Sequence, residues 1–189
     1  MDYQTIIDKF YEEDTPLRRI ILVHSRAVAD KALHICDAHP EIQLNLDFVE
    51  AAAMLHDIGI IQCDAPGIHC FGTRPYIQHG LAGEEMLLAY CEETETEQEK
   101  AVLRKIAHVC SHHTGAGISR DEIVRQHLDL PLGDFLPVTI EEKVICYADK
   151  FYSKTRLEIE KDKEHVERSI AKFGEAGLLR FREWDKLFG

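Results

Sequence analysis

Apolar residues recur along most of this chain at intervals of three and four positions, and alternating, strand-like patterns are nearly absent. That spacing places apolar side chains on one face of an α-helix. Capping signals mark three helix starts: Thr15 before Pro16, Ser119 with Glu122, and Thr139 with Glu142. Other helices are predicted at about 2–13, 46–58, 77–91, 97–113 and 163–187. The sequence therefore predicts an all-α fold.

Glycine and proline punctuate three segments, 59–75, 114–118 and 129–138, which are predicted to be loops. No internal repeat, low-complexity stretch or Gly/Ser linker marks a domain boundary. We therefore expect one domain over 1–189, with a core at about 15–160 and a C-terminal helical extension at about 161–189. A chain of this length can bury a polar site in its interior.

The charge balance is acidic, with 22 Lys and Arg against 34 Asp and Glu and a formal net charge of -12. This balance argues against a protein that tracks a nucleic-acid backbone, so no polynucleotide partner is expected. A small phosphorylated substrate remains compatible, because bound cations reverse the local potential. Periodicity leaves the oligomeric state open.

The N-terminal residues are acidic, and no apolar run approaches the roughly 20 residues that span a bilayer. We therefore expect a cytoplasmic protein without membrane contact. The six cysteines form no C-x-x-C pair and are expected to stay reduced, without disulfides.

Helical phase indicates which polar residues face the interior. His24 lies in register with the apolar residues Ile20 and Val28, and Asp149 lies in register with Ile145. A buried, ionised aspartate must be paired, heavily hydrogen-bonded or bound to a metal. Asp149 is therefore the most informative of these positions.

The same test places four more polar residues on inward faces. They are His56 in line with Val49 and Ala53, Asp57 beside it, His79 in line with Ala82 and Gly83, and His113 in line with Ile106 and Val109. Imidazole and carboxylate ligands together suit Fe, Mn, Zn, Co or Ni. Six ligands exceed the need of one tetrahedral ion, so the sequence predicts two divalent ions that share a carboxylate.

The order of His24, the His56-Asp57 pair and Asp149 resembles the signature of the HD-domain superfamily of metal-dependent phosphohydrolases. The contexts VHSRAVADKAL, AAAMLHDIGI and EEKVICYADKF are similar as well. His79 in YIQHGLAGEEML and His113 in HHTGAGIS look like the extra ligands of small stand-alone, dinuclear HD proteins. The resemblance implies a single HD-domain helical bundle with a metal site in its core.

The resemblance also implies a ligand set for each ion. His24, His56, Asp57 and Asp149 would hold one ion, and Asp57, His79 and His113 would hold the other, with Asp57 as the bridge. Fe or Mn is favoured, and Zn, Co, Ni or Mg is also compatible. The 59–75 loop is interpreted as a lid over this site.

The resemblance predicts a phosphohydrolase that acts on a nucleotide, a dinucleoside polyphosphate or another small phosphate ester through a metal-activated water. In this hypothesis Asp57 and Lys150 belong to the catalytic site, and His112 is a candidate proton donor. Lys154, Arg26 and Arg74 are further candidates for phosphate contact. Two alternatives stay open: a di-iron oxygenase of the HD-like type, and a non-catalytic HD sensor or binding domain.

Overall fold

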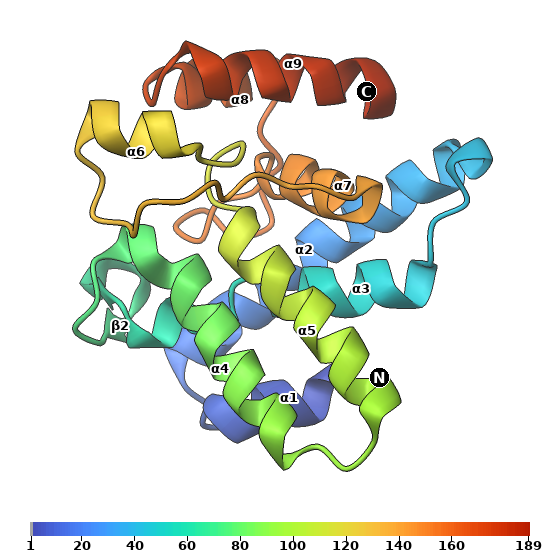
Figure 1. The fold of residues 1–189 in the computed structure, drawn as a ribbon, viewed down its shortest axis with the longest axis vertical. Helices are drawn as coiled ribbons and strands as arrows, with labels where there is room; N and C mark the ends of the chain where they lie inside the picture. Colours follow the sequence, from blue (N-terminus) through green and yellow to red (C-terminus); the bar gives the residue numbers. More distant parts are fainter. Residues whose placement is uncertain (1) are drawn as a thin grey trace.

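A computed structural model describes residues 2–189, whose regular elements are helices apart from one short hairpin (Figure 1). The helices are α1 (Tyr3–Phe10), α2 (Pro16–Ala38), α3 (Leu46–Leu55), α4 (His79–Glu93), α5 (Glu97–His112), α6 (Arg120–Gln126), α7 (Ile140–Asp149), α8 (Lys163–Ala171) and α9 (Glu175–Phe188). The predicted all-α class is confirmed. None of the helices within residues 2–189 is both long and apolar enough to cross a membrane.

The three capping signals work as predicted. The side chain of Thr15 accepts a hydrogen bond from the Arg18 amide and starts α2, and Thr139 starts α7 in the same way. At α6 the capping box is complete, because Ser119 and Glu122 each accept from the other's backbone amide. These contacts satisfy amides that have no partner inside their helix.

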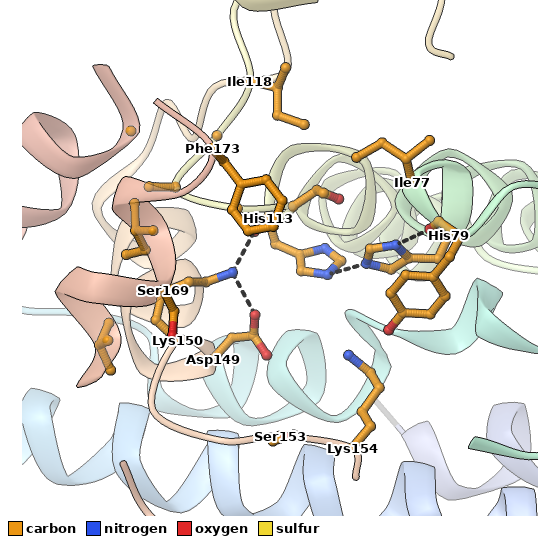
Figure 2. Close-up of a pocket in the computed structure, with 18 of the residues that line it drawn as sticks. Ile77, His79, His113, Ile118, Asp149, Lys150, Ser153, Lys154, Ser169 and Phe173 are labelled. Carbon is orange, nitrogen blue, oxygen red and sulfur yellow. Dashed lines mark hydrogen bonds and ion pairs between the residues drawn. The ribbon is translucent and has the colours of Figure 1, made fainter. Parts of the chain in front are cut away.

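The predicted helix at 163–187 is wrong as one element, because the chain breaks into α8 and α9. Gly174 lies between them with a φ of 120°, a backbone conformation that glycine adopts without strain. The apolar pattern continues through the break, which is why periodicity alone does not reveal it. α8 forms one wall of a cavity beside α7 (Figure 2).

The 59–75 segment is more ordered than the predicted loop. It contains the 3₁₀ helices η2 (Ile58–Gln62) and η3 (Pro66–Ile68) and an antiparallel hairpin of β1 (Asp64–Ala65) with β2 (Cys70–Phe71). A further 3₁₀ helix, η4 (Tyr76–Gln78), leads into α4, and η1 (Pro40–Ile42) lies between α2 and α3. The hairpin is the only sheet within residues 2–189.

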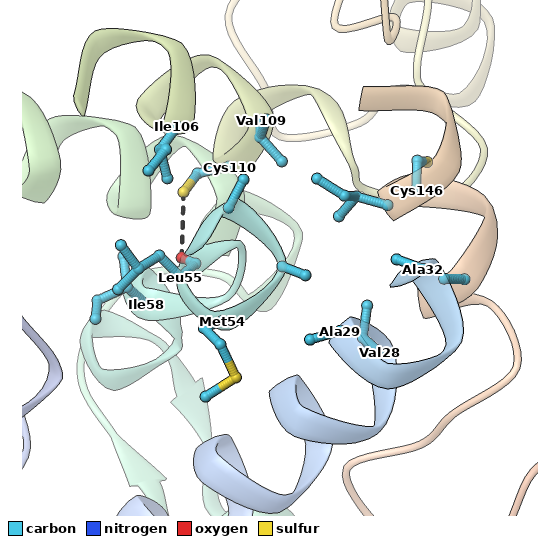
Figure 3. Close-up of a cluster of buried hydrophobic side chains, with 14 of the residues drawn as sticks. Val28, Ala29, Ala32, Met54, Leu55, Ile58, Ile106, Val109, Cys110 and Cys146 are labelled. Atoms are coloured by element: carbon cyan, nitrogen blue, oxygen red, sulfur yellow. Dashed lines mark hydrogen bonds between the residues drawn. The ribbon is translucent and has the colours of Figure 1, made fainter. Parts of the chain in front are cut away.

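The core fills the space between α2, α3, α5 and α7 (Figure 3). Small residues let the backbones of neighbouring helices approach closely. A Cβ on Gly80 of α4 would lie 2.4 Å from the Cys110 carbonyl oxygen of α5, closer than real Cβ contacts. The thiol of Cys110 in turn donates to the Leu55 carbonyl at 3.3 Å. All six cysteines are buried and free.

Candidate metal centre

Five helices bring one buried polar group each to the middle of the bundle. His24 lies within α2, His56 follows the last residue of α3, His79 begins α4, His113 follows α5, and Asp149 ends α7. All five side chains, and that of Asp57, are almost fully enclosed. Helical phase thus identified side chains that do meet in the structure.

Asp57 lies at the centre of this cluster. Its Oδ2 atom is 3.1 Å from His24 Nε2 and 3.0 Å from His56 Nε2. Its Oδ1 atom is 3.4 Å from His79 Nε2 and 3.3 Å from His113 Nε2. The two carboxylate oxygens therefore face different pairs of histidines.

Asp149 completes the first of these groups. Its Oδ1 atom lies 3.0 Å from His24 Nε2 and 3.5 Å from His56 Nε2. Within each group the ligand atoms all lie within 4.8 Å of one another: His24, His56, Asp57 and Asp149 form one, and Asp57, His79 and His113 form the other. This division matches the two ligand sets that the family resemblance implies.

The backbone after α3 explains how two adjacent residues face one centre. The helix predicted at about 46–58 is shorter in the structure, because α3 ends at Leu55 and η2 begins at Ile58. His56 keeps helical angles, whereas Asp57 has a φ of -105° and a ψ of 11°. In a continuous α-helix the two side chains would diverge by about 100°. The change of helix type turns both toward the cluster.

Hydrogen bonds fix which nitrogen of three imidazole rings faces the cluster. Nδ1 of His56 lies 2.6 Å from the Ala53 carbonyl oxygen, that of His79 lies 2.7 Å from the Tyr76 carbonyl, and that of His113 lies 2.7 Å from the Cys110 carbonyl. A carbonyl only accepts, so each Nδ1 carries the proton. Each Nε2 of a neutral ring then directs a lone pair at the cluster, as a metal ligand does.

Several polar atoms of the cluster are buried without a well-aligned hydrogen bond. They are both ring nitrogens of His24, His56 Nε2 and both carboxylate oxygens of Asp57. Unsatisfied polar atoms in a protein interior are costly, and each such atom needs an explanation. A bound divalent cation would satisfy lone pairs that converge in this way, so the residues fit a metal centre.

Electrostatics keep most of these groups in the form that binds a metal. Although burial opposes ionisation of Asp57, the charges of His56 and Lys154 and hydrogen bonds hold its pKa well below its usual range. Burial lowers the pKa of His79 to about 3, and the neighbouring charge of His113 adds to this effect. His56 differs, because the charges of Asp57 and Asp149 outweigh its burial and raise its pKa to about 9.

Two lysines lie against the carboxylates. Lys154 Nζ is 2.5 Å from Asp57 Oδ2, and Lys150 Nζ is 2.7 Å from Asp149 Oδ2 and 3.1 Å from the His113 carbonyl oxygen (Figure 2). Their side chains are only 13% and 11% exposed. Both line a cavity of about 830 Å³ that opens from the cluster.

The remaining candidates lie elsewhere. His112 is turned away from the cluster, because its ring stacks on His108 with the centroids 3.6 Å apart, and its Nδ1 lies 2.9 Å from the His108 carbonyl oxygen. Arg26 pairs with Glu50 at 2.9 Å, and Arg74 pairs with Glu85. The structure therefore does not bring His112, Arg26 and Arg74 together with the six residues of the cluster.

Sequence reasoning missed two features of the site. Tyr76 lies flat on the imidazole of His79, with ring centroids 4.8 Å apart and 18° between the planes. The cavity is also lined by α8 and by Phe173, which follow all six candidate ligands in the sequence. The position of Tyr76, an aromatic residue three positions before His79, could have indicated this contact. No comparable local signal pointed to Phe173.

A family model described as the HD domain matches residues 21–153. The match covers more than half of the chain, and this protein belongs to the HD-domain family. The predicted membership is thereby confirmed. α8 and α9 lie beyond the matched residues.

Three curated relatives are similar to this chain. A tRNA (cytidine(56)-2'-O)-methyltransferase of Picrophilus torridus is 32% identical over 73% of this chain and 33% of its own length. One of the same description from Thermoplasma volcanium is 26% identical over 70% of this chain and 32% of its own length. An uncharacterized protein of Methanocaldococcus jannaschii is 28% identical over 80% of this chain and 78% of its own length. No solved structure matches significantly.

These relatives correct two expectations. The predicted phosphohydrolase of small phosphate esters is contradicted, because the named relatives are tRNA methyltransferases. The expected absence of a polynucleotide partner is contradicted for the same reason. The net charge describes the whole molecule, whereas RNA binding depends on the local charge at the binding site. This chain spans only about one third of the length of those methyltransferases.

Proposed function

We propose that this HD domain is a metal-dependent, phosphate-binding component of tRNA modification. The observation that carries the proposal is the position of Asp57 between two groups of metal-ligating atoms, with Lys154 in contact with it at 2.5 Å. Divalent ions at such a centre supply concentrated positive charge. That charge is complementary to the phosphate groups of an RNA backbone.

The proposed ligands follow the two groups described above. His24, His56, Asp57 and Asp149 would hold one divalent ion, and Asp57, His79 and His113 the other, with Fe or Mn favoured over Zn, Co, Ni or Mg. Lys150 and Lys154 are the proposed phosphate contacts, since both line the cavity beside the cluster.

Local charge at the centre favours a phosphate even though the chain is acidic overall. Two divalent ions contribute a charge of about +4 to a site that holds two carboxylates and two lysines. The centre thus becomes strongly positive although the formal net charge of the whole chain is -12. Binding through one local site, rather than along an extended basic face, is the form of RNA recognition that this charge distribution supports.

The relatives support the choice of RNA but not an assignment of methyl transfer to this chain. The methyltransferases are about three times as long as the aligned region, so other parts of those proteins lie outside it. The relative from Methanocaldococcus jannaschii is covered over 78% of its length and so consists largely of this domain. We therefore assign RNA binding to this domain. A tRNA partner also accords with a cytoplasmic location.

The test is equilibrium binding of a labelled tRNA transcript to protein loaded with Mn²⁺ or Fe²⁺, at several salt concentrations. We expect binding that falls when the metal is chelated and that is lost in Asp57→Asn. His34→Ala is the matched control, because His34 is an exposed histidine of the same helix as His24. Equal tRNA binding by the loaded protein, the chelated protein and Asp57→Asn would refute the proposal.

A further inference from the structure

The cavity beside the metal centre has two chemically different ends (Figure 2). His79, His113, Asp149, Lys150 and Lys154 line the end next to the cluster. The other end is lined mainly by apolar side chains, namely Ile118, Leu128, Val166, Ile170 and Phe173. The volume of about 830 Å³ is in the range of sites that enclose a small molecule or one unit of a polymer.

The apolar end is built largely by α8 and the turn that follows it. Val166 and Ile170 of α8 belong to the buried core, whereas Phe173 is 71% exposed. In Figure 2, Ser169 and Phe173 lie across the cavity from Ile77 and His79. A phenyl ring at the rim of a cavity, left largely open to water, is a surface on which a flat ligand can stack.

The backbone that carries Phe173 is held in place. The amide of Phe173 donates to the Ile170 carbonyl at 2.9 Å, and Gln126 Nε2 donates to the Phe173 carbonyl at 2.8 Å. Gly174 then turns the chain with its φ of 120°. The ring is therefore presented from a fixed turn that is tied to α6, and not from a free end.

We infer that the apolar end of this cavity binds a single unstacked nucleobase of RNA, with Phe173 as its stacking surface. The inference rests on the proposed function, because it places the phosphate of the same nucleotide at the lysine and metal end. A base offers a flat face for stacking and polar edges for hydrogen bonds. The cavity lining matches both properties, since Gln126, Ser169 and Thr114 add polar groups among its apolar side chains.

The test compares four phosphorylated probes on the metal-loaded full chain: inorganic phosphate, ribose 5-phosphate, adenosine 5'-monophosphate and hexyl phosphate. Equilibrium dissociation constants are measured by calorimetry or by competition. We expect the adenosine nucleotide to bind more tightly than ribose 5-phosphate. Phe173→Ala should weaken nucleotide binding by roughly 5- to 150-fold, the range for loss of one aromatic stack on a base, and leave inorganic phosphate unaffected.

Two further variants separate stacking from a general change in the protein. Phe173→Trp should restore or improve nucleotide binding, because it keeps a flat aromatic ring. Leu179→Ala removes another exposed apolar side chain, 52% exposed on α9 and outside the cavity lining, and should change nothing.

The possible failures are distinguishable. If inorganic phosphate does not bind to the metal-loaded protein, the proposed function and this inference both fail. If phosphate binds, but the nucleotide binds no more tightly than ribose 5-phosphate, only the base site is refuted. Tighter binding of hexyl phosphate than of the nucleotide would assign the apolar end to an aliphatic chain, and would also overturn the inference.

Discussion

The Nε2 atoms of His79 and His113 lie 3.0 Å apart, although neither carries a proton in its neutral form. Both Nδ1 atoms donate to backbone carbonyls, so the two Nε2 lone pairs face each other. A hydrogen bond between them would need one ring to be protonated on both nitrogens, as a singly charged imidazolium, and burial lowers the pKa of each ring. A cation held between two lone pairs removes this repulsion.

This arrangement predicts that the second ion depends on both histidines. His79→Ala or His113→Ala should reduce the bound metal from about two ions per chain to about one, because His24, His56 and Asp149 remain in place. Elemental analysis of protein purified without chelators measures the ratio. His34→Ala is again the control. An unchanged ratio in both single variants would contradict the second site.

His79 and His113 come together because the backbones of α4 and α5 pack closely. Gly80 makes this close packing possible because it has no side chain. A Cβ at Gly80 would lie 2.4 Å from the Cys110 carbonyl oxygen, so Gly80→Ala must push α4 away from α5. We expect a loss of about 1–3 kcal/mol in the free energy of unfolding, as for other overpacked sites, together with weaker binding of the second ion. Urea unfolding and metal analysis measure the two effects.

Gly67→Ala is the control for this substitution. A Cβ at Gly67 meets nothing within 4 Å, so the free energy of unfolding should change by less than about 1 kcal/mol. Equal stability of the two variants would show that the contact between α4 and α5 does not require glycine.

The sequence predicted the cluster because helical period fixes the direction of a side chain. His24 and Asp149 lie in apolar rows of the amphipathic helices α2 and α7, and such rows face the core in any bundle. The same reasoning could not place Lys154, which follows α7 in an irregular segment without a period. Nor could it detect the break at Gly174, where the apolar pattern runs on through the turn.

The function was harder to predict than the fold, and the reason is physical. The same imidazole and carboxylate ligands occur in metal sites of several reaction classes. A ligand set therefore indicates that a metal binds, but it does not indicate which substrate is used. The substrate depends on the rest of the cavity. Part of that lining, including Phe173, comes from a region beyond the family match.

Metal binding at the first group should depend strongly on pH because of His56. Its pKa is about 9, since the charges of Asp57 and Asp149 outweigh the effect of burial. At neutral pH the ring is mostly protonated, whereas a ligand must be neutral, so binding must release that proton. The association constant for the metal should therefore rise about tenfold per pH unit from about pH 6 to 8, and level off above the pKa of His56.

Calorimetric titration of the metal in buffers of different ionisation enthalpy counts the released protons directly. We expect about one proton from His56, and none from Asp57 or Asp149, whose pKa values lie well below their usual range. Metal affinity that is constant over this pH interval would show that His56 is already neutral in the protein.

Arg180 joins α9 to the segment that follows His113. Its Nε donates to the Ala116 carbonyl at 2.8 Å, and its Nη2 donates to the Gly117 carbonyl at 2.7 Å and to Glu122 Oε2 at 2.8 Å. Arg180→Met would leave the buried carboxylate of Glu122 without this partner. We therefore expect a loss of about 2–4 kcal/mol in the free energy of unfolding, measured in urea.

Arg182→Met is the matched control for Arg180→Met on the same helix. Arg182 pairs with Glu167 at 2.6 Å, but its side chain is 51% exposed, and such surface pairs contribute less than about 1 kcal/mol. Adding Glu122→Gln to Arg180→Met should recover part of the stability, because a neutral amide is less costly to bury than an unpaired carboxylate. Equal losses in the free energy of unfolding for the two arginine substitutions would show that Arg180 contributes no more than a surface ion pair. Apolar packing alone would then hold α9 to the cavity wall.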